Sequence, residues 1–164
     1  PPSVIGFLLI VVLGNQGVIG TWIKEFFGHS IIFTSYAAVI AATVVAFPLM
    51  FQTAKAGFQG VHRKFEEAAK DLGATNFQVF LRVSLPLAKR ALLTGTVLSC
   101  ARALGEFGAT LMFAGNIPGV TQTVPTAIYM AIDSGDMPFA WLWVITIFAF
   151  SFLLLIFTRT KENE

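Results

Sequence analysis

Long apolar runs separated by shorter polar stretches make up most of the 164-residue chain. Three of these runs reach the roughly 20 residues that a helix needs to cross a bilayer, whereas the first is too short to cross alone. The pattern predicts an all-α, multi-pass transmembrane bundle with one long polar interruption, at residues 57–86. The predicted spans cover residues 1–13, 31–54, 87–112 and 139–158.

The polar interruption contains an amphipathic helix. Its apolar positions recur at i, i+3, i+4 and i+7, which is the spacing of one helical face. They are Phe65, Ala68, Ala69 and Leu72. The charged positions on the other side are Glu66, Glu67, Lys70 and Asp71. Gly73 follows where a residue in left-handed conformation would end this helix.

A second short helix is expected directly after Gly73. Thr75 and Gln78 have the spacing of a capping box, which would begin it. Its apolar face would carry Phe77, Phe80 and Leu81. Pro86 is expected to stop or kink the preceding helix, because proline has no N–H to donate. The pattern alone fits an ordinary helix on the membrane surface as well as a docking surface for a soluble partner.

Composition and charge give the predicted spans a direction. Hydrophobic residues make up 55% of the chain and charged residues only 12%, which excludes an ordinary soluble domain. Seven of the eleven Lys and Arg residues lie between Lys55 and Arg90, and Arg159 and Lys161 follow the last span. By the positive-inside rule both regions, and with them the C-terminus, are cytoplasmic. Acidic residues are interleaved with the basic ones, so no nucleic-acid surface is expected.

The third predicted span carries charged residues inside the membrane. Its small and polar positions recur at i, i+4, i+7 and i+11, which predicts a stripe along one helical face. They are Gly95, Ser99, Arg102 and Glu106. Arg102 and Glu106 are four residues apart and can pair on that face. Charges in a span normally face a bundle interior or a watery cavity. Two compatible interpretations follow: the pair fixes helix packing, and it lies near a gate of a translocation pathway.

The outward connection after this span contains turn residues from Gly115 to Gly119. A short helix is expected from Val124 to Ile132, with Thr123 as its N-cap. The amides and hydroxyls of this connection could hydrogen-bond an oxyanion or a partner protein, although a solvated loop is the default interpretation.

The sequence contains no recognisable motif for catalysis, metal binding or cofactor binding. Cys100 is the single cysteine, so neither an intrachain disulfide nor a cysteine metal cluster can form. His29 and His62 are not linked by any metal-ligand spacing. The chain has no Gly-x-x-x-x-Gly-Lys-Ser/Thr phosphate loop and no arrangement of nucleophile and base. We therefore expect no catalytic residue, no metal site and no cofactor.

The segment Glu67-Ala68-Ala69-Lys70-Asp71-Leu72-Gly73, followed after nine residues by Val83-Ser84-Leu85-Pro86, resembles the cytoplasmic EAA loop of ABC-importer membrane subunits. Every fixed position of that pattern is matched, except that Val83 stands where the pattern has Ile. The resemblance implies a coupling helix that seats in a cleft of an ATP-hydrolysing subunit. The implied coupling residues are Glu66, Glu67, Ala68, Ala69, Lys70, Gly73 and Pro86.

A second resemblance covers nearly the whole chain, to membrane subunits of molybdate importers. It is carried by residues 47–50, 101–110, 113–119 and 121–123. Sulfate and thiosulfate permeases are similar through the Gly-Glu-(Phe/Tyr)-Gly portion, but the Asn-Ile-Pro-Gly-x-Thr-Gln-Thr-x-Pro tail is closer to the molybdate group. The start at Pro1 fits an internal helix of that family, so the chain is expected to be truncated, with at least one further span upstream.

The resemblance implies a type I ABC-importer permease fold in a prokaryotic inner membrane, without an ATPase site of its own. The implied partners are a second copy of the subunit, two cytoplasmic ATP-binding subunits, an extracytoplasmic oxyanion-binding protein and membrane lipid. Tungstate, sulfate and thiosulfate remain alternatives to molybdate. Outside this class, an ATPase-independent channel or secondary transporter comes second and a membrane enzyme third.

Overall fold

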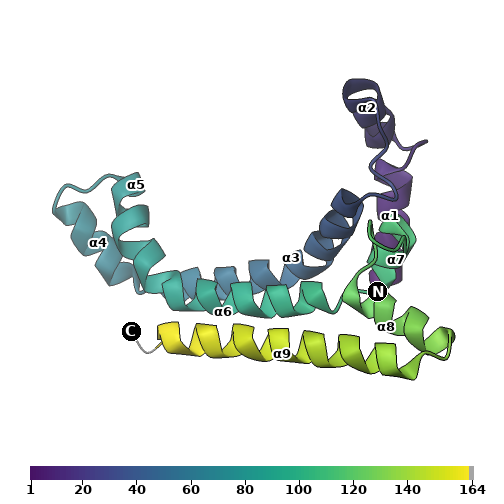
Figure 1. Ribbon diagram of the computed structural model, residues 1–164. Coiled ribbons are helices and arrows are strands. Elements are labelled where there is room, and N and C mark those ends of the chain that lie inside the picture. Colours follow the sequence, from purple (N-terminus) through teal and green to yellow (C-terminus); the bar gives the residue numbers. More distant parts are fainter. Residues whose placement is uncertain (163–164) are drawn as a thin grey trace. The chain divides into compact units, whose positions relative to one another are not determined.

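The computed structural model describes residues 1–162, and the regular elements in this part of the chain are all helices (Figure 1). The all-α prediction is therefore confirmed. The C-terminus, for which the charge pattern predicts a cytoplasmic position, lies outside the described residues.

The chain divides into two compact units, each described here by itself. The core unit comprises residues 1–46 and 101–153. The loop unit comprises residues 47–100 and the last helix from Leu154 onward. The division crosses α3 (Ser35–Gln59) two residues before Pro48, which lies inside that helix.

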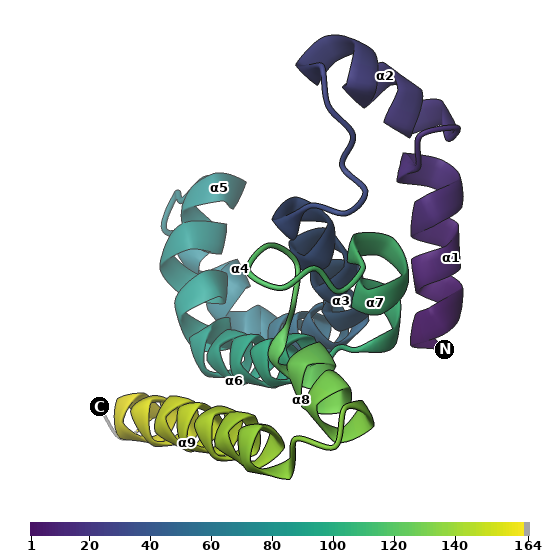
Figure 2. The ribbon, with the colours of Figure 1, turned by 45° about the vertical axis from the view of Figure 1, so that its right-hand side comes forward.

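The core unit is built on close contacts between small residues. It holds the first part of α3 together with α1 (Pro2–Leu13), α2 (Val18–Phe27), α7 (Gly108–Ala114), α8 (Val124–Asp133) and most of α9 (Met137–Glu162). α1 lies beside α7 (Figure 2), and a Cβ at Gly6 would come within 3.0 Å of the Cα of Ala109. The two helices can therefore approach this closely because position 6 has no side chain.

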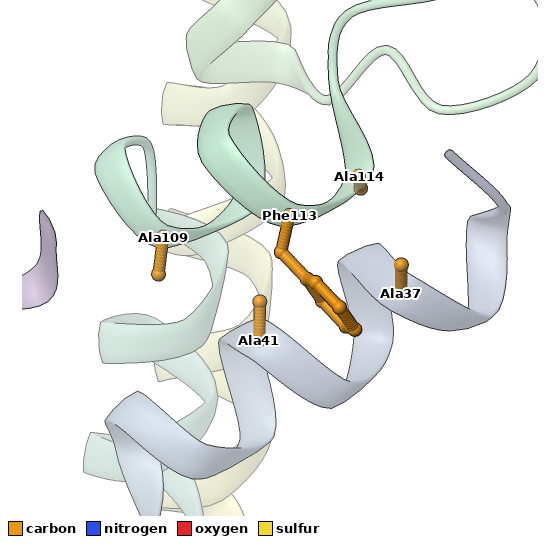
Figure 3. Close-up of a cluster of buried hydrophobic side chains, with 5 residues drawn as sticks. All are labelled: Ala37, Ala41, Ala109, Phe113 and Ala114. Carbon is orange, nitrogen blue, oxygen red and sulfur yellow. The ribbon is translucent and has the colours of Figure 1, made fainter. Parts of the chain in front are cut away.

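The centre of the core unit lies between α3 and α7. The fully buried side chains there are Ala37, Ala41, Ala109, Phe113 and Ala114 (Figure 3). The ring of Phe113 extends from α7 toward α3 between Ala37 and Ala41. Alanines on both helices leave room for this one large side chain, so the ring fills the space between the backbones.

Two described helices are long and apolar enough to cross a membrane alone, namely α3 and residues Met137–Ile156 of α9. Two bent pairs meet the criterion only together: α1 with Val18–Phe26, at 54°, and Asn76–Leu104 with α7, at 61°. If each bent pair is one span, the described residues hold four candidate spans.

The segment expected as a third span over residues 87–112 is not a single helix. α6 (Leu85–Leu104) ends, and α7 begins after residues 105–107. Glu106 therefore lies in a break and not on the helical face that carries the rest of the predicted stripe. The break is stable because the carboxylate of Glu106 accepts a hydrogen bond from the N–H of Ala109, one of the first amides of α7, at 2.9 Å.

The second span also begins later than residue 31. Phe33 adopts a left-handed backbone conformation, with φ +62°, and so cannot continue a helix. The hydroxyl of Thr34 then accepts a hydrogen bond from the N–H of Ala37, which lies in the first turn of α3. Local backbone geometry, and not apolar length, sets the start of this helix.

The loop unit confirms the local predictions for the polar interruption. α4 (Arg63–Asp71) ends in Gly73 with φ +86°. Its C-terminus is a Schellman motif, in which the N–H of Gly73 donates to the carbonyl of Lys70 and the N–H of Ala74 to that of Ala69.

The short helix α5 (Asn76–Val79) begins with the expected capping box. The Thr75 N–H donates to Oε1 of Gln78 at 2.9 Å, and the Gln78 N–H donates to Oγ1 of Thr75 at 3.3 Å. Both contacts satisfy backbone or side-chain groups that a free helix start would leave to water.

Pro86, expected to stop or kink the helix, does not end it. A π-helical turn, η1 (Phe80–Ser84), joins α5 to α6, and the N–H of Leu85 donates to the carbonyl of Phe80, five residues back. Pro86 is the second residue of α6. Pro86 has no N–H to donate to the preceding turn. The π-turn places one extra residue in that turn, and the helical run continues through the proline.

Candidate functional site

An apolar groove of about 400 Å³ runs along α4 in the loop unit. One wall consists of the predicted apolar face of α4, and η1 and the start of α6 form the other. The lining residues are Phe65, Ala68, Ala69, Leu72, Arg82, Val83, Pro86 and Leu87. Leu72 is 90% exposed, so the face of α4 is available to a partner and is not consumed by packing within the described chain.

The charged residues of α4 do not all behave alike. Glu67 and Lys70 are exposed. Glu66 is half-buried, and its Oε1 accepts a hydrogen bond from the hydroxyl of Ser84 at 2.7 Å. Of the predicted charged coupling residues, Glu66 is therefore turned toward its own subunit, while Glu67 and Lys70 face outward.

Gly73 contributes to this region through its backbone. No heavy atom lies within 4 Å of the position that a Cβ would take there, so the glycine is required for its positive φ and not for space. It lets the chain reverse between α4 and α5.

The pair expected from the sequence is present in the core unit. Nη1 of Arg102 lies 2.9 Å from Oε2 of Glu106. The side chain of Glu106 is only 2% exposed, whereas that of Arg102 is 36% exposed. The other carboxylate oxygen of Glu106 accepts the hydrogen bond from the Ala109 N–H. Both oxygens of a buried carboxylate thus have a donor, which is the condition under which such a charge is tolerated.

A cavity of about 430 Å³ borders this pair within the core unit. Its lining is mostly apolar, and the polar members are Glu106, Thr110, Thr123 and Thr146. The hydroxyl of Thr110 is bonded to backbone carbonyls of the break, including that of Phe107 at 2.9 Å. Thr123 is the N-cap residue of α8, as predicted. The cavity is therefore a largely apolar space with one neutralised charge pair at its edge.

The other two residues of the predicted stripe lie on α6 within the loop unit. A Cβ at Gly95 would come within 3.0 Å of the Cβ of Thr53, so this glycine allows α6 to pack against α3. The hydroxyl oxygen of Ser99 is buried and has no hydrogen-bond partner among the described residues. The structure brings together Arg102 and Glu106 in the core unit, while Gly95 and Ser99 belong to the loop unit.

Two structural features of these regions could not be read from the sequence spacing. The contact between Glu66 and Ser84 joins residues 18 positions apart, and no spacing rule connects them. The helix break at Glu106 could have been suspected from the two glycines, Gly105 and Gly108, that flank it. Among the described residues, no cluster of three His, Cys, Asp or Glu side chains could hold a metal ion.

The chain as a whole matches a known class of membrane transport component. The profile of the family described as "binding-protein-dependent transport system inner membrane component" matches residues 1–161. The chain belongs to this family, and the resemblance inferred from its motifs is confirmed.

Its relatives include proteins named as molybdenum and as sulfate transport permeases. The chain is 57% identical to the putative molybdenum transport system permease protein YvgM of Bacillus subtilis, over 100% of this chain and 72% of the relative. It is 44% identical to the molybdenum transport system permease protein ModB of Escherichia coli K12, over 90% of this chain and 65% of the relative. A probable sulfate transport system permease protein, cysT of Prototheca wickerhamii, is 40% identical over 83% of this chain and 53% of the relative.

Proposed function

We propose that this chain forms part of the membrane subunit of an ATP-driven importer that carries molybdate or the closely similar tungstate. Membership of the inner membrane component family makes it a transport permease component, and we propose that ATP hydrolysis takes place on a partner subunit. The substrate is supported by the similarity to the molybdenum permeases of B. subtilis and E. coli. The sulfate permease is less similar, so sulfate or thiosulfate is the second candidate.

The groove beside α4 is the observation that carries the coupling part of this proposal. Four positions of the EAA pattern line it together, namely Ala68, Ala69, Val83 and Pro86. Small side chains keep the groove open, and Glu67 and Lys70 lie exposed on the charged face of the same helix. An ATP-binding subunit would place an apolar side chain in the groove and a basic group against Glu67. The interface would then have a partly desolvated apolar contact at its centre and charged contacts at its rim.

Arg102 and Glu106 support a role near the translocation pathway. An oxyanion such as molybdate is a dianion, and a bare buried carboxylate would repel it strongly where the dielectric is low. Arg102 neutralises that carboxylate, and the cavity beside it offers a lining of threonine hydroxyls and apolar groups. Gly95 and Ser99 remain proposed pathway residues because they lie on α6, the helix whose end carries Arg102.

The proposed assembly contains two copies of the subunit and two ATP-binding subunits on the cytoplasmic side. An extracytoplasmic binding protein would deliver the oxyanion and would hold most of the selectivity, and lipid would cover the exposed apolar faces. Closure of the ATP-binding pair would displace α4 and so switch the pathway between its two sides. In this orientation the loop at residues 57–86 and the C-terminus face the cytoplasm.

The test uses the intact subunit reconstituted in proteoliposomes with its ATP-binding subunit and binding protein. ATP hydrolysis and uptake are measured with the binding protein loaded with molybdate, tungstate or sulfate. We expect molybdate, and tungstate with it, to stimulate both activities several-fold and sulfate to leave them at the basal rate. Stimulation by sulfate alone would overturn the substrate assignment. Uptake without any ATP-binding subunit would overturn the transporter class in favour of a channel or secondary transporter.

A further inference from the structure

The hydrogen bond between Glu66 and Ser84 links α4 to the helix run that leads into the membrane. Ser84 ends the π-turn η1 and is only 6% exposed, and its hydroxyl donates to Oε1 of Glu66 at 2.7 Å. A hydroxyl that donates to a carboxylate at this distance makes one of the stronger hydrogen bonds available to side chains.

One side of this link is continuous helix. Residues Asn76–Leu104 run through α5, η1 and α6 without interruption. Ser84 lies at the π-turn, immediately before Leu85 and Pro86. A force applied at Ser84 therefore acts directly on the helix run, with no loop in between.

The other side of the link, α4, is otherwise loosely held. The turn that joins it to α5 contains Gly73, which has open space around it. Leu72 is almost fully exposed and Phe65 is exposed, so the apolar face of α4 borders an open groove instead of a packed interface. In the described part of the chain, Glu66 is the one residue of α4 whose side chain hydrogen-bonds to another helix.

We propose that the hydrogen bond between Glu66 and Ser84 transmits displacement of α4 to α6. Glu66 is a positioning residue that acts through Ser84, distinct from Glu67, which faces a partner. Without the bond, α4 would rotate about the Gly73 turn while η1 and α6 stay in place. A movement of the ATP-binding subunit would then displace α4 without displacing α6. This inference rests on the proposed docking of α4 to an ATP-binding subunit.

The experiment compares Ser84→Ala and Glu66→Ala, which remove the donor and the acceptor of this bond, with the unaltered subunit in the full complex, reconstituted in proteoliposomes with molybdate-loaded binding protein. The readout is the amount of molybdate transported per ATP hydrolysed. Loss of a charge-assisted hydrogen bond shifts an equilibrium by about tenfold, so we expect this ratio to fall by up to about tenfold in each variant. Co-purification of the ATP-binding subunit should be unchanged, and the double variant should be no worse than either single one.

Two controls make the result specific. Ser84→Thr keeps the hydroxyl and should retain most of the transport per ATP. Ser151→Ala removes a serine hydroxyl from an exposed position on α9 and should leave the ratio unchanged. Normal ratios in both Ser84→Ala and Glu66→Ala would overturn the inference. Loss of the ATP-binding subunit from these variants would also overturn it, because the bond would then be part of the docking surface.

A measurement on the free subunit separates the link from assembly. A spin label at Asp71, in a background with Cys100 replaced by serine, reports how freely α4 moves. We expect Ser84→Ala to raise the mobility of the label, and unchanged mobility would contradict the proposed link. Failure of the unaltered subunit to bind any ATP-binding subunit would instead defeat the proposed function, whatever the label shows.

Discussion

Glu66 on α4 and Glu106 between α6 and α7 are both carboxylates that fasten one helix to another, but their surroundings differ. Glu106 is nearly inaccessible and has a donor on each oxygen, from Arg102 and from the backbone of α7. Glu66 is half-buried and uses one hydroxyl beside an open groove. The comparison indicates that the buried charge of the core unit is held on both oxygens, while α4 in the loop unit keeps one side open beside the groove.

The largest effect is expected from leaving the buried carboxylate without its guanidinium. Arg102→Met should lower the free energy of unfolding of the intact subunit by about 3 kcal/mol, because Glu106 would remain buried with only the Ala109 N–H as donor. The measurement is denaturant unfolding in detergent micelles. The double variant with Glu106→Gln should recover most of the loss, since no charge is then stranded. An unchanged free energy of unfolding in Arg102→Met would contradict the conclusion that Glu106 depends on its partners more than Glu66 does.

The next effect is expected at Gly115 in the core unit. This residue has φ +73°, and a Cβ there would come within 2.8 Å of Cδ1 of Phe33. Gly115→Ala combines an unfavourable backbone conformation with a clash and should cost about 2 kcal/mol in the same unfolding measurement. Phe33→Ala in addition should relieve the clash and leave the backbone cost. If adding Phe33→Ala does not recover any of the unfolding free energy lost in Gly115→Ala, the ring of Phe33 does not clash with the new Cβ.

The groove should respond in binding and not in stability. Ala68→Arg would place a long charged side chain in the apolar groove and should weaken binding of the ATP-binding subunit by at least about tenfold, as for a residue at the centre of an interface. Unfolding should change little, because the groove is open. The matched control is Lys64→Arg, which puts the same side chain at an exposed position on α4 outside the groove lining. Equal binding by both variants would show that the groove is not the docking surface.

Sequence rules predict the loop unit better than the break in the core unit, for a physical reason. The apolar face of α4, the positive φ of Gly73 and the capping box of Thr75 follow from contacts within a few residues, and the structure confirms them. At the helix break, the carboxylate of Glu106 caps the first turn of α7 instead of extending a continuous helix from α6. The periodicity of the sequence does not show which of these two arrangements is more stable.

The same limit applies to the helix that follows α4. Proline is expected to interrupt a helix because it cannot donate the hydrogen bond to the carbonyl four residues back. In the π-turn before Pro86 the hydrogen bonds run to the carbonyl five residues back, so this expectation does not apply. The contact of Ser84 with Glu66 depends on that turn and on the fold of the loop, so neither could be expected from local sequence.

The smallest effect is expected at Gly73, and it tests whether the open surroundings of the loop unit matter. Gly73→Ala also meets the penalty of a positive φ, but no neighbouring atom lies near the new Cβ, so it should cost only about 1 kcal/mol, confined to α4. Hydrogen exchange of the α4 amides should become faster by about fivefold, while exchange in α7 stays unchanged. Gly73→Asn should cost less than Gly73→Ala, because asparagine tolerates the left-handed conformation better. If Gly73→Ala instead destabilised the whole subunit as much as Gly115→Ala, the end of α4 would have to be packed as tightly as the core unit.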